Sequence, residues 1–366
     1  MKVGPYAPLN EQVKLLLYVL PAVHSLDIFG QSSNRQLHVH TSGREASTLG
    51  LSASCSAENF TVDLKVAFAY MLSAASVGAV SALVASLQSL RKQTHLPILV
   101  FSSLTSIQET KLRMFLQHEL KLPNIGFRSV RIDLVRQIKC TKSVKSTRRG
   151  EDLRLRGSFI KYQLFGEDDW DGLLYLDIDT YVMSSPDRVL CDLWRLNTTF
   201  AVAPTGGIAC KLGQRFRGSF NSGVWYIRPD RGLQMKIFAA AATNNKFKCI
   251  AGDQKFLHHI LMQSRFSIVQ PVCLSREYNC QVFQDRARLV VPMAQCLTWS
   301  TDRTVKILHW SGNTKPSTYG EDKISVSEEH QIDSQFLPEY PTILRQYKSV
   351  QNITTEFLVG ANFTGL

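Results

Sequence analysis

The chain has 366 residues, of which 44% are hydrophobic and 20% charged, ordinary values for a globular protein. These values exclude a disordered or collagen-like chain, and the length allows a sizeable core without metal or disulfide staples. Lys and Arg number 42 against 30 Asp and Glu residues, so the formal net charge is +12. A basic protein of this kind can bind nucleic acid, acidic membranes or phosphorylated small molecules, and composition does not choose among them.

Residues 1–62 are predicted to form a leader and a linker. An apolar run at residues 15–23 follows Lys2 and Lys14. It is too short to span a bilayer, which takes about 20 residues, but it suits the apolar centre of a signal peptide or a weak anchor. Either interpretation would bring the N-terminus to a membrane. Residues 31–58 are rich in Ser, Gly, Thr and Ala, which indicates a linker.

Strands and helices are predicted to alternate from Val66 onward. Residues 66–72 are typical of a buried strand, 73–76 of a loop, and 77–90 repeat apolar residues at helical spacing. A second strand is expected at 97–101 and an amphipathic helix at 105–120. The uncharged stretch 66–90 is also long enough for a membrane helix, but its loop and serines favour strand and helix. The alternation predicts an α/β fold with a mostly parallel sheet covered on both faces.

The basic charge is concentrated between Arg136 and Arg156. Eight basic and two acidic residues give this segment a charge of +6 (8 − 2), half of the whole excess. It is interpreted as a solvated loop or as an electrostatic funnel for a diphosphate or an acidic surface. The segment lacks the aromatic residues that would stack on bases, which argues against nucleic acid as a partner. A non-catalytic protein that binds nucleic acid or membranes here stays a further alternative.

Cysteine spacing and sequons bear on the cellular compartment. None of the eight cysteines forms a CxxC pair, which disfavours zinc and thioredoxin-type chemistry and leaves disulfide pairing open. Four Asn-x-Thr sequons begin at Asn59, Asn197, Asn352 and Asn362. They favour the secretory pathway, and a Golgi lumen or membrane location is expected, with the cytoplasm as the alternative.

The most informative segment is residues 158–182. Residues 159–165 are predicted to be helical, 170–172 to form a turn, and 173–182 to form a buried strand that emerges at Asp177 and Asp179. Alternate residues of a strand point to the same side, so the two carboxylates are expected together at the strand's carboxyl end. Two carboxylates suit a divalent cation, and open α/β sheets bind ligands at that edge.

Three further segments place polar residues beside apolar runs. Residues 220–227 join a polar turn to a strand, 251–254 precede a helix at 255–262, and 306–310 form a strand that runs into a loop with Gly and Lys. Each segment alone has an ordinary structural explanation. These explanations are a turn, a helix N-terminus, a buried histidine and a surface loop.

Together and in this order, four motifs resemble glycosyltransferase family 8, the glycogenin-like retaining glycosyltransferases. The motifs are Leu-Asp-Ile-Asp-Thr (176–180), Phe-Asn-Ser-Gly-Val (220–224), Gly-Asp-Gln (252–254) and His-x-x-Gly-x-x-Lys-Pro (309–316). The resemblance spans roughly residues 66–317. It implies a GT-A fold, in which a Rossmann-like sheet flanked by helices binds a nucleotide sugar. A single catalytic domain is expected at 63–317, followed by a tail at 318–366 with a last helix at 337–350.

The resemblance also implies roles for single residues. Asp177, Asp179 and His309 would bind Mn²⁺, and Asp253, Gln254 and Lys161 would be catalytic. The UDP-sugar donor would contact the end of the first strand, the metal motif and the loop that closes on the diphosphate. These donor-binding residues are Met71, Leu72, Ser73, Lys161, Asp177, Ile178, Asp179, Asn221, Ser222, Gly312 and Lys315.

Chemistry supports these roles independently of the resemblance. A departing nucleoside diphosphate gains negative charge, which a bridging cation and the side chains of Lys161 and Lys315 would stabilise. Two carboxylates with an imidazole suit Mn²⁺ better than Mg²⁺, which prefers oxygen ligands. Whether Asp253 is a nucleophile, or attack occurs at the front face, stays open.

We therefore expect a retaining, Mn²⁺-dependent transferase that moves a hexose from a UDP-sugar to a glycan, protein or lipid acceptor. The alternative is a glycogenin-like initiator that glucosylates itself. Such a protein needs an acceptor tyrosine, and the C-terminal tail offers Tyr319, Tyr340 and Tyr347, none of them marked by its surroundings.

Overall fold

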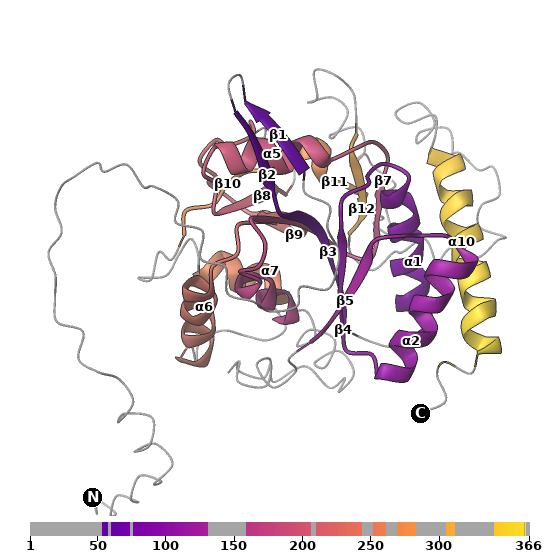
Figure 1. Ribbon diagram of the computed structural model, residues 1–366. Coiled ribbons are helices and arrows are strands. Elements are labelled where there is room, and N and C mark those ends of the chain that lie inside the picture. Colours follow the sequence, from indigo (N-terminus) through magenta and orange to yellow (C-terminus); the bar gives the residue numbers. More distant parts are fainter. Residues whose placement is uncertain are drawn as a thin grey trace, which may run out of the picture. The chain divides into compact units, whose positions relative to one another are not determined.

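The computed structural model describes residues 53–57, 60–73, 76–130, 159–205, 210–243, 252–260, 269–282, 305–311, 340–361 and 363 (Figure 1). All of these residues belong to one compact unit, residues 48–366. The apolar run at 15–23 and the basic segment 136–156 lie outside the described residues, so the predictions made for them are unchanged.

A seven-stranded sheet forms the centre of this unit, in the order β10-β8-β9-β6-β3-β4-β5. Neighbouring strands are parallel except at β9, which runs antiparallel to both β8 and β6. The mostly parallel sheet is thus confirmed. Its strands are β3 (Val66–Leu72), β4 (Ile98–Ser102), β5 (Ile125–Ser129), β6 (Gly172–Leu176), β8 (Phe200–Pro204), β9 (Phe220–Ile227) and β10 (Val272–Cys273).

Helices cover both faces of the sheet, as predicted. Successive side chains of β3 point to opposite faces, so Phe68 and Tyr70 enter one core while Ala67 and Ala69 enter another. The first core is closed by α1 (Val77–Arg91), α2 (Ser106–Met114) and α5 (Asp187–Arg195). The second is closed by the 3-10 helix η3 (Phe159–Gly166), α6 (Arg231–Thr243) and α7 (Gly252–His258).

The start of α1 confirms that residues 66–90 form a strand and a helix. Ser76 caps α1, where its hydroxyl accepts a hydrogen bond from the Ala79 backbone N–H. Thr105 caps α2 in the same way, within a capping box that Gln108 completes. Among the described residues, no helix has both the length and the apolar character needed to cross a bilayer.

A second sheet of three strands stands beside the first. β7 (Thr180–Val182) pairs antiparallel with β12 (Ile307–Trp310), and β12 pairs in parallel with β11 (Cys280–Val282). A third core fills the space between this sheet, α1 and α10 (Tyr340–Gly360). α10 lies along α1 in Figure 1, and it continues ten residues beyond the helix end predicted at 350.

Several predicted boundaries were wrong because pairing between distant segments sets them. The strand expected at 173–182 is broken after Leu176, and its second half joins the small sheet as β7. The polar turn expected at Asn221 and Ser222 lies inside β9, which pairs with strands on both sides. Strand pairing does not explain α7, which begins at Gly252 rather than at 255. The helix expected at 105–120 is confirmed as α2 and the π-helical turn Phe115–Glu119 that continues it.

The end of the predicted linker also differs. β1 (Ala53–Ala57) lies within residues 31–58, which were expected to be a linker, and it pairs antiparallel with β2 (Phe60–Leu64), which follows that stretch. The sequence of β2 alternates apolar and polar residues, which suits a strand with one covered face.

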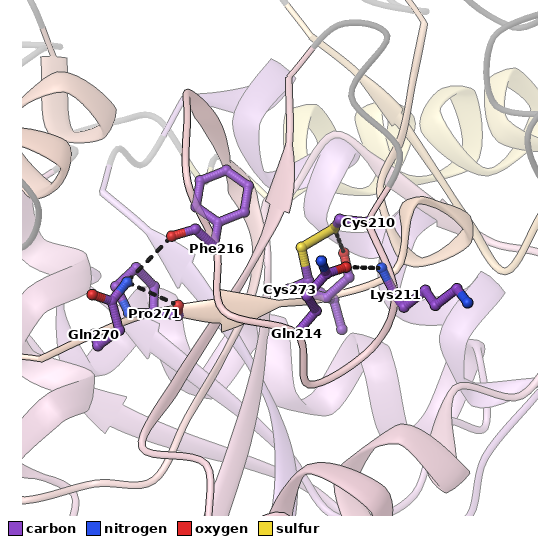
Figure 2. The surroundings of a disulfide bond; sticks show 8 residues. Cys210, Lys211, Gln214, Phe216, Gln270, Pro271 and Cys273 are labelled. Carbon is purple, nitrogen blue, oxygen red and sulfur yellow. Dashed lines mark hydrogen bonds between the residues drawn. A yellow bond between two sulfur atoms is a disulfide. The ribbon is translucent and has the colours of Figure 1, made fainter.

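A disulfide bond joins Cys210 to Cys273 at the β10 edge of the large sheet (Figure 2). Hydrogen bonds reinforce the junction: the Cys273 backbone N–H donates to the Gln214 carbonyl, and the Gln270 side chain donates to the Phe216 carbonyl. Cys191 and Cys280 are disulfide-bonded as well. Sequence spacing left the pairing open, and the structure shows that one bond holds the segment before β9 against the sheet.

Candidate metal and donor site

Asp177, Asp179 and His309 meet at one point, as the four motifs predicted. One ligand atom from each lies within 4.8 Å of the others. His309 Nε2 is 3.3 Å from Asp179 Oδ1 and 3.8 Å from Asp177 Oδ2. The pairing of β12 with β7 places His309 opposite Thr180, and the Trp310 backbone N–H donates to the Asp179 carbonyl at 3.0 Å. Strand register therefore brings the distant histidine to the two carboxylates.

A turn, rather than a strand face, holds the two carboxylates. Asp177 is the last residue that pairs with the large sheet, since its N–H donates to the Gly223 carbonyl at 2.7 Å. The chain then turns, and the Thr180 hydroxyl donates back to the Asp177 carbonyl at 2.8 Å. Thr180 is fully buried and hydrogen-bonded to Ser86, which in turn is bonded to Tyr70. The turn is thus anchored to both α1 and β3.

Lys161 and Tyr175 hold one oxygen of Asp177. The Lys161 ammonium lies 2.8 Å from Asp177 Oδ1, and the Tyr175 hydroxyl donates to the same oxygen. Lys161 also donates to the Ser222 carbonyl at 3.3 Å, and only 7% of its surface is exposed. Because both donors act on Oδ1, the oxygen that faces His309 is Oδ2. The lysine expected beside the donor is therefore engaged with a carboxylate of the protein itself.

Gly223 makes room for the imidazole. A Cβ atom at this position would lie 2.0 Å from His309 Cε1 and 2.5 Å from Nδ1. A side chain of any size would displace the ring, so β9 can pass beside His309 only with glycine here. Sequence reasoning included Gly223 in a motif without assigning it this role.

Asn279 is a site residue that sequence reasoning missed. Its Oδ1 lies 3.0 Å from His309 Nδ1, and its Nδ2 donates to Asn221 Oδ1 at 3.0 Å. Only 2% of its surface is exposed. It lies just before β11, between Tyr278 and Cys280, and no local pattern distinguishes it from an ordinary turn residue.

The donor set fits a divalent cation. Two carboxylates and one imidazole are an accepted combination for a transition metal, and a histidine ligand usually has its second ring nitrogen held by an oxygen, as Asn279 holds His309 here. His309 is buried, whereas the side chains of Asp177 and Asp179 are 25% and 13% exposed. The two carboxylates thus form the side of the cluster that a ligand can reach.

The remaining predicted residues divide into four groups. Met71 and Leu72 end β3, and Ser73 follows them. β3 runs beside β6 with Tyr70 opposite Leu176, so these three residues reach the same sheet edge as the cluster. Ile178 lies within the turn and packs on the first core. In the part of the chain that the structure describes, no hydrogen bond or ion pair links Gln254 to the cluster. The Asp253 side chain, Gly312 and Lys315 lie outside the described residues.

Tyr347 lies behind the site and is poorly placed as a sugar acceptor. Only 1% of its surface is exposed, and its ring centroid is 4.9 Å from that of Trp310. Burial, with a further contribution from the charge of Asp179, raises the pKa of its phenol well above the usual value. The phenol therefore stays protonated and inside the core, which weakens the self-glucosylating alternative at this residue. Tyr319 and the Tyr340 side chain lie outside the described residues.

No protein-family model matches the chain, and no curated protein matches it in sequence. Solved structures do resemble it. Mouse xyloside xylosyltransferase 1, in its apo form, matches 69% of this chain and 99% of its own at 16% identity, with a TM-score of 0.45. The galactosyltransferase LgtC, in complex with donor and acceptor sugar analogs, matches 78% and 95% at 14% identity, with a TM-score of 0.43. The apo glycosyltransferase GlyE of Streptococcus pneumoniae TIGR4 matches 78% and 63% at 19% identity, with a TM-score of 0.44.

Proposed function

We propose that the protein is a metal-dependent glycosyltransferase of GT-A type, which transfers a hexose from a UDP-sugar to a glycan, protein or lipid acceptor with retention of configuration. The observation that carries the proposal is the meeting of Asp177, Asp179 and His309. They come from two of the four family 8-like motifs, which lie far apart in the sequence. A chance likeness in unrelated segments would give no reason for three such side chains to converge.

Three atoms would hold the cation: Asp177 Oδ2, Asp179 Oδ1 and His309 Nε2. Because one ligand is an imidazole, Mn²⁺ suits the site better than Mg²⁺. A bound divalent cation would act as a Lewis acid on the diphosphate leaving group. The protein's own part is to hold the three ligands ready at the sheet edge where β3 and β6 end, which is where open α/β sheets bind nucleotides.

Lys161 would act through Asp177 rather than on the donor directly. Its ammonium offsets one of the two carboxylate charges, so Lys161 and the two aspartates together carry one net negative charge (−2 + 1 = −1). By engaging Oδ1, Lys161 and Tyr175 also stop Asp177 from turning that oxygen toward the cation. We expect the Asp177 ligand to be monodentate for this reason.

The sugar end of the site would be built by segments around the cluster. In this proposal Asn221, Ser222, Asp253 and Gln254 contact the donor sugar, and the loop with Gly312 and Lys315 closes on the diphosphate. Asn221 supports this role, because its Oδ1 is used within the protein while no described residue accepts a hydrogen bond from its Nδ2. That amide group is thus available to a sugar hydroxyl.

We further propose that the protein works in the secretory pathway, with its catalytic domain over residues 63–317. Disulfides form and persist in oxidising compartments, and Cys191, Cys210, Cys273 and Cys280 are all disulfide-bonded. This supports a Golgi location over a cytoplasmic one, in agreement with the four sequons.

A donor screen tests the function. The purified protein is incubated with UDP-glucose, UDP-galactose and related UDP-hexoses, with and without Mn²⁺, and UDP release is measured. We expect release with at least one donor, dependent on Mn²⁺ and lost in Asp179→Asn. The matched control is Asp192→Asn, because Asp192 makes only surface ion pairs with Arg188 and Arg195 among the described residues. UDP release that is the same with and without Mn²⁺, and the same in Asp179→Asn, would refute the proposed function.

A further inference from the structure

We infer that the side chains of Asn221 and Asn279 form a chain of hydrogen bonds, here called the amide relay, between the backbone N–H of Gly223 and the imidazole of His309. This relay determines which nitrogen of His309 carries the proton. In this arrangement His309 Nδ1 carries the proton and Nε2 keeps its lone pair toward the two carboxylates. The inference rests on the cation site of the proposed function, but it does not depend on sugar transfer.

The relay begins at the backbone N–H of Gly223, which can donate a hydrogen bond but never accept one. A backbone N–H is always a donor, and the N–H of Gly223 lies 2.8 Å from the side chain of Asn221. The atom of Asn221 that faces it must therefore be the carbonyl oxygen, Oδ1. An asparagine amide can otherwise be turned over with little change in shape, so this contact decides its orientation.

The same reasoning orients the second amide. Asn221 Oδ1 also lies 3.0 Å from an amide atom of Asn279. Because the amide oxygen of Asn221 can only accept, the Asn279 atom that faces it must be the nitrogen, Nδ2. The other end of the Asn279 amide must therefore be its oxygen, Oδ1. That oxygen faces His309 Nδ1 at 3.0 Å and accepts from it, so Nδ1 must carry the proton. Ser311 Oγ, 3.2 Å from Nδ1, can donate or accept and therefore imposes no direction.

Burial makes this order of donors and acceptors costly to break. Asn279 is 2% and His309 3% exposed, so a donor turned toward a donor would find no water to replace the lost bond. Leaving a buried polar group unpaired costs about 1–3 kcal/mol. Hydrogen bonds in a poorly solvated interior also strengthen one another along a chain. The relay therefore keeps a proton on Nδ1, which leaves Nε2 as the nitrogen that can serve a cation.

The tautomer matters because a cation needs the lone pair of the facing nitrogen. With the proton on Nδ1, Nε2 lies 3.3 Å from Asp179 Oδ1 as a ready ligand. With the proton on Nε2, the ring would instead donate to a carboxylate and close the site. Partners of this kind typically change metal affinity by about 10–100-fold when they are removed. Asn279 is thus a positioning residue for His309, not a catalytic one.

Nitrogen-15 NMR of the histidine rings in the metal-free protein tests the inference directly. The His309 signals are assigned by their loss in His309→Gln. We expect the Nδ1–H tautomer in the unaltered protein and a mixture, or the Nε2–H tautomer, in Asn279→Ala. Mn²⁺ binding, followed by electron paramagnetic resonance, should weaken by about 10–100-fold in the same variant. An Nε2–H tautomer in the unaltered protein, or no change in either readout on substitution, would overturn the relay.

Two further variants separate the relay from general damage. Gln281→Ala removes a neighbouring buried amide of β11, which donates to the Pro204 carbonyl, and it should leave tautomer and Mn²⁺ affinity unchanged. Asn279→Asp keeps the shape and the acceptor for Nδ1 but sets an oxygen against Asn221 Oδ1. If Asn279→Ala does not fold, this variant should keep the Nδ1–H tautomer while losing thermal stability, and loss of that tautomer would count against the relay. A correct tautomer and Mn²⁺ binding without UDP release would refute the proposed function alone.

Discussion

Gly223→Ala should disable the cation site while leaving the rest of the fold in place. The added Cβ would lie 2.0 Å from His309 Cε1, whereas ordinary contacts begin at 3.4 Å, so ring and strand must separate by 1.4 Å (3.4 − 2.0). Metal–ligand distances tolerate only about 0.2 Å. β9 is held by pairing on both sides, so the smaller group, the imidazole, is expected to move away from Asp177 and Asp179.

The expected effect is a loss of Mn²⁺ affinity of at least about 10–100-fold, the range seen when a ligand's support is removed. Unfolding in urea should show a loss of about 1–3 kcal/mol, typical of overpacking. Mn²⁺ titration followed by electron paramagnetic resonance measures the first effect. Gly78→Ala in α1 is the control, since nothing lies within 4 Å of its added Cβ. Mn²⁺ affinity should stay the same in this variant, and the free energy of unfolding should stay the same or rise. If Gly223→Ala binds Mn²⁺ like the unaltered protein, the close approach of β9 to His309 is not what shapes the site.

Three other changes test packing, covalent bonding and ionisation elsewhere in the fold. Phe115→Ala removes a ring stacked at 4.1 Å on Phe357 of α10, and it should lower the free energy of unfolding by about 3–5 kcal/mol; a loss below 1 kcal/mol in urea denaturation would contradict this packing. Replacing Cys210 and Cys273 together by Ser opens a loop with a sequence separation of 63, which should cost about 4 kcal/mol by loop entropy. Urea denaturation of this variant and of the unreduced parent measures the loss, and equal stabilities would mean that the bond does not form. Burial raises the pKa of Asp187, so its ionisation lowers stability as pH rises from the carboxyl's usual pKa to the folded value. Asp187→Asn should therefore raise the melting temperature at neutral pH more than in acid, and equal shifts at both would refute the assignment.

Local signals in the sequence were enough to find most elements of the large sheet. Residues 66–72 form an apolar run bounded by polar residues, and they became β3 with the predicted bounds. A strand buried on both faces needs little more than such a run, because every side chain enters one core or the other. Boundaries that depend on partners were missed. The break after Leu176 is set by β12, which lies far along the chain and pairs with β7.

The candidate site shows the same division. Asp177, Asp179 and His309 were predicted from motif order, and they do converge. Their geometry was predicted for the wrong reason, because a turn and not a strand face brings the carboxylates together. Asn279 could not be found, since its importance arises only from the residues that surround it in space.

α10 bears on how far the chain can be shortened without harm. Its Tyr347 packs on Trp310 in the third core, next to the strand that carries His309, and Ile343 belongs to the same core. A version truncated before residue 340 would expose to solvent the side of β12 that α10 covers. The imidazole of His309 would then be held less firmly in place. α10 thus supports the candidate cation site from behind, and shortened versions of the protein should retain this helix.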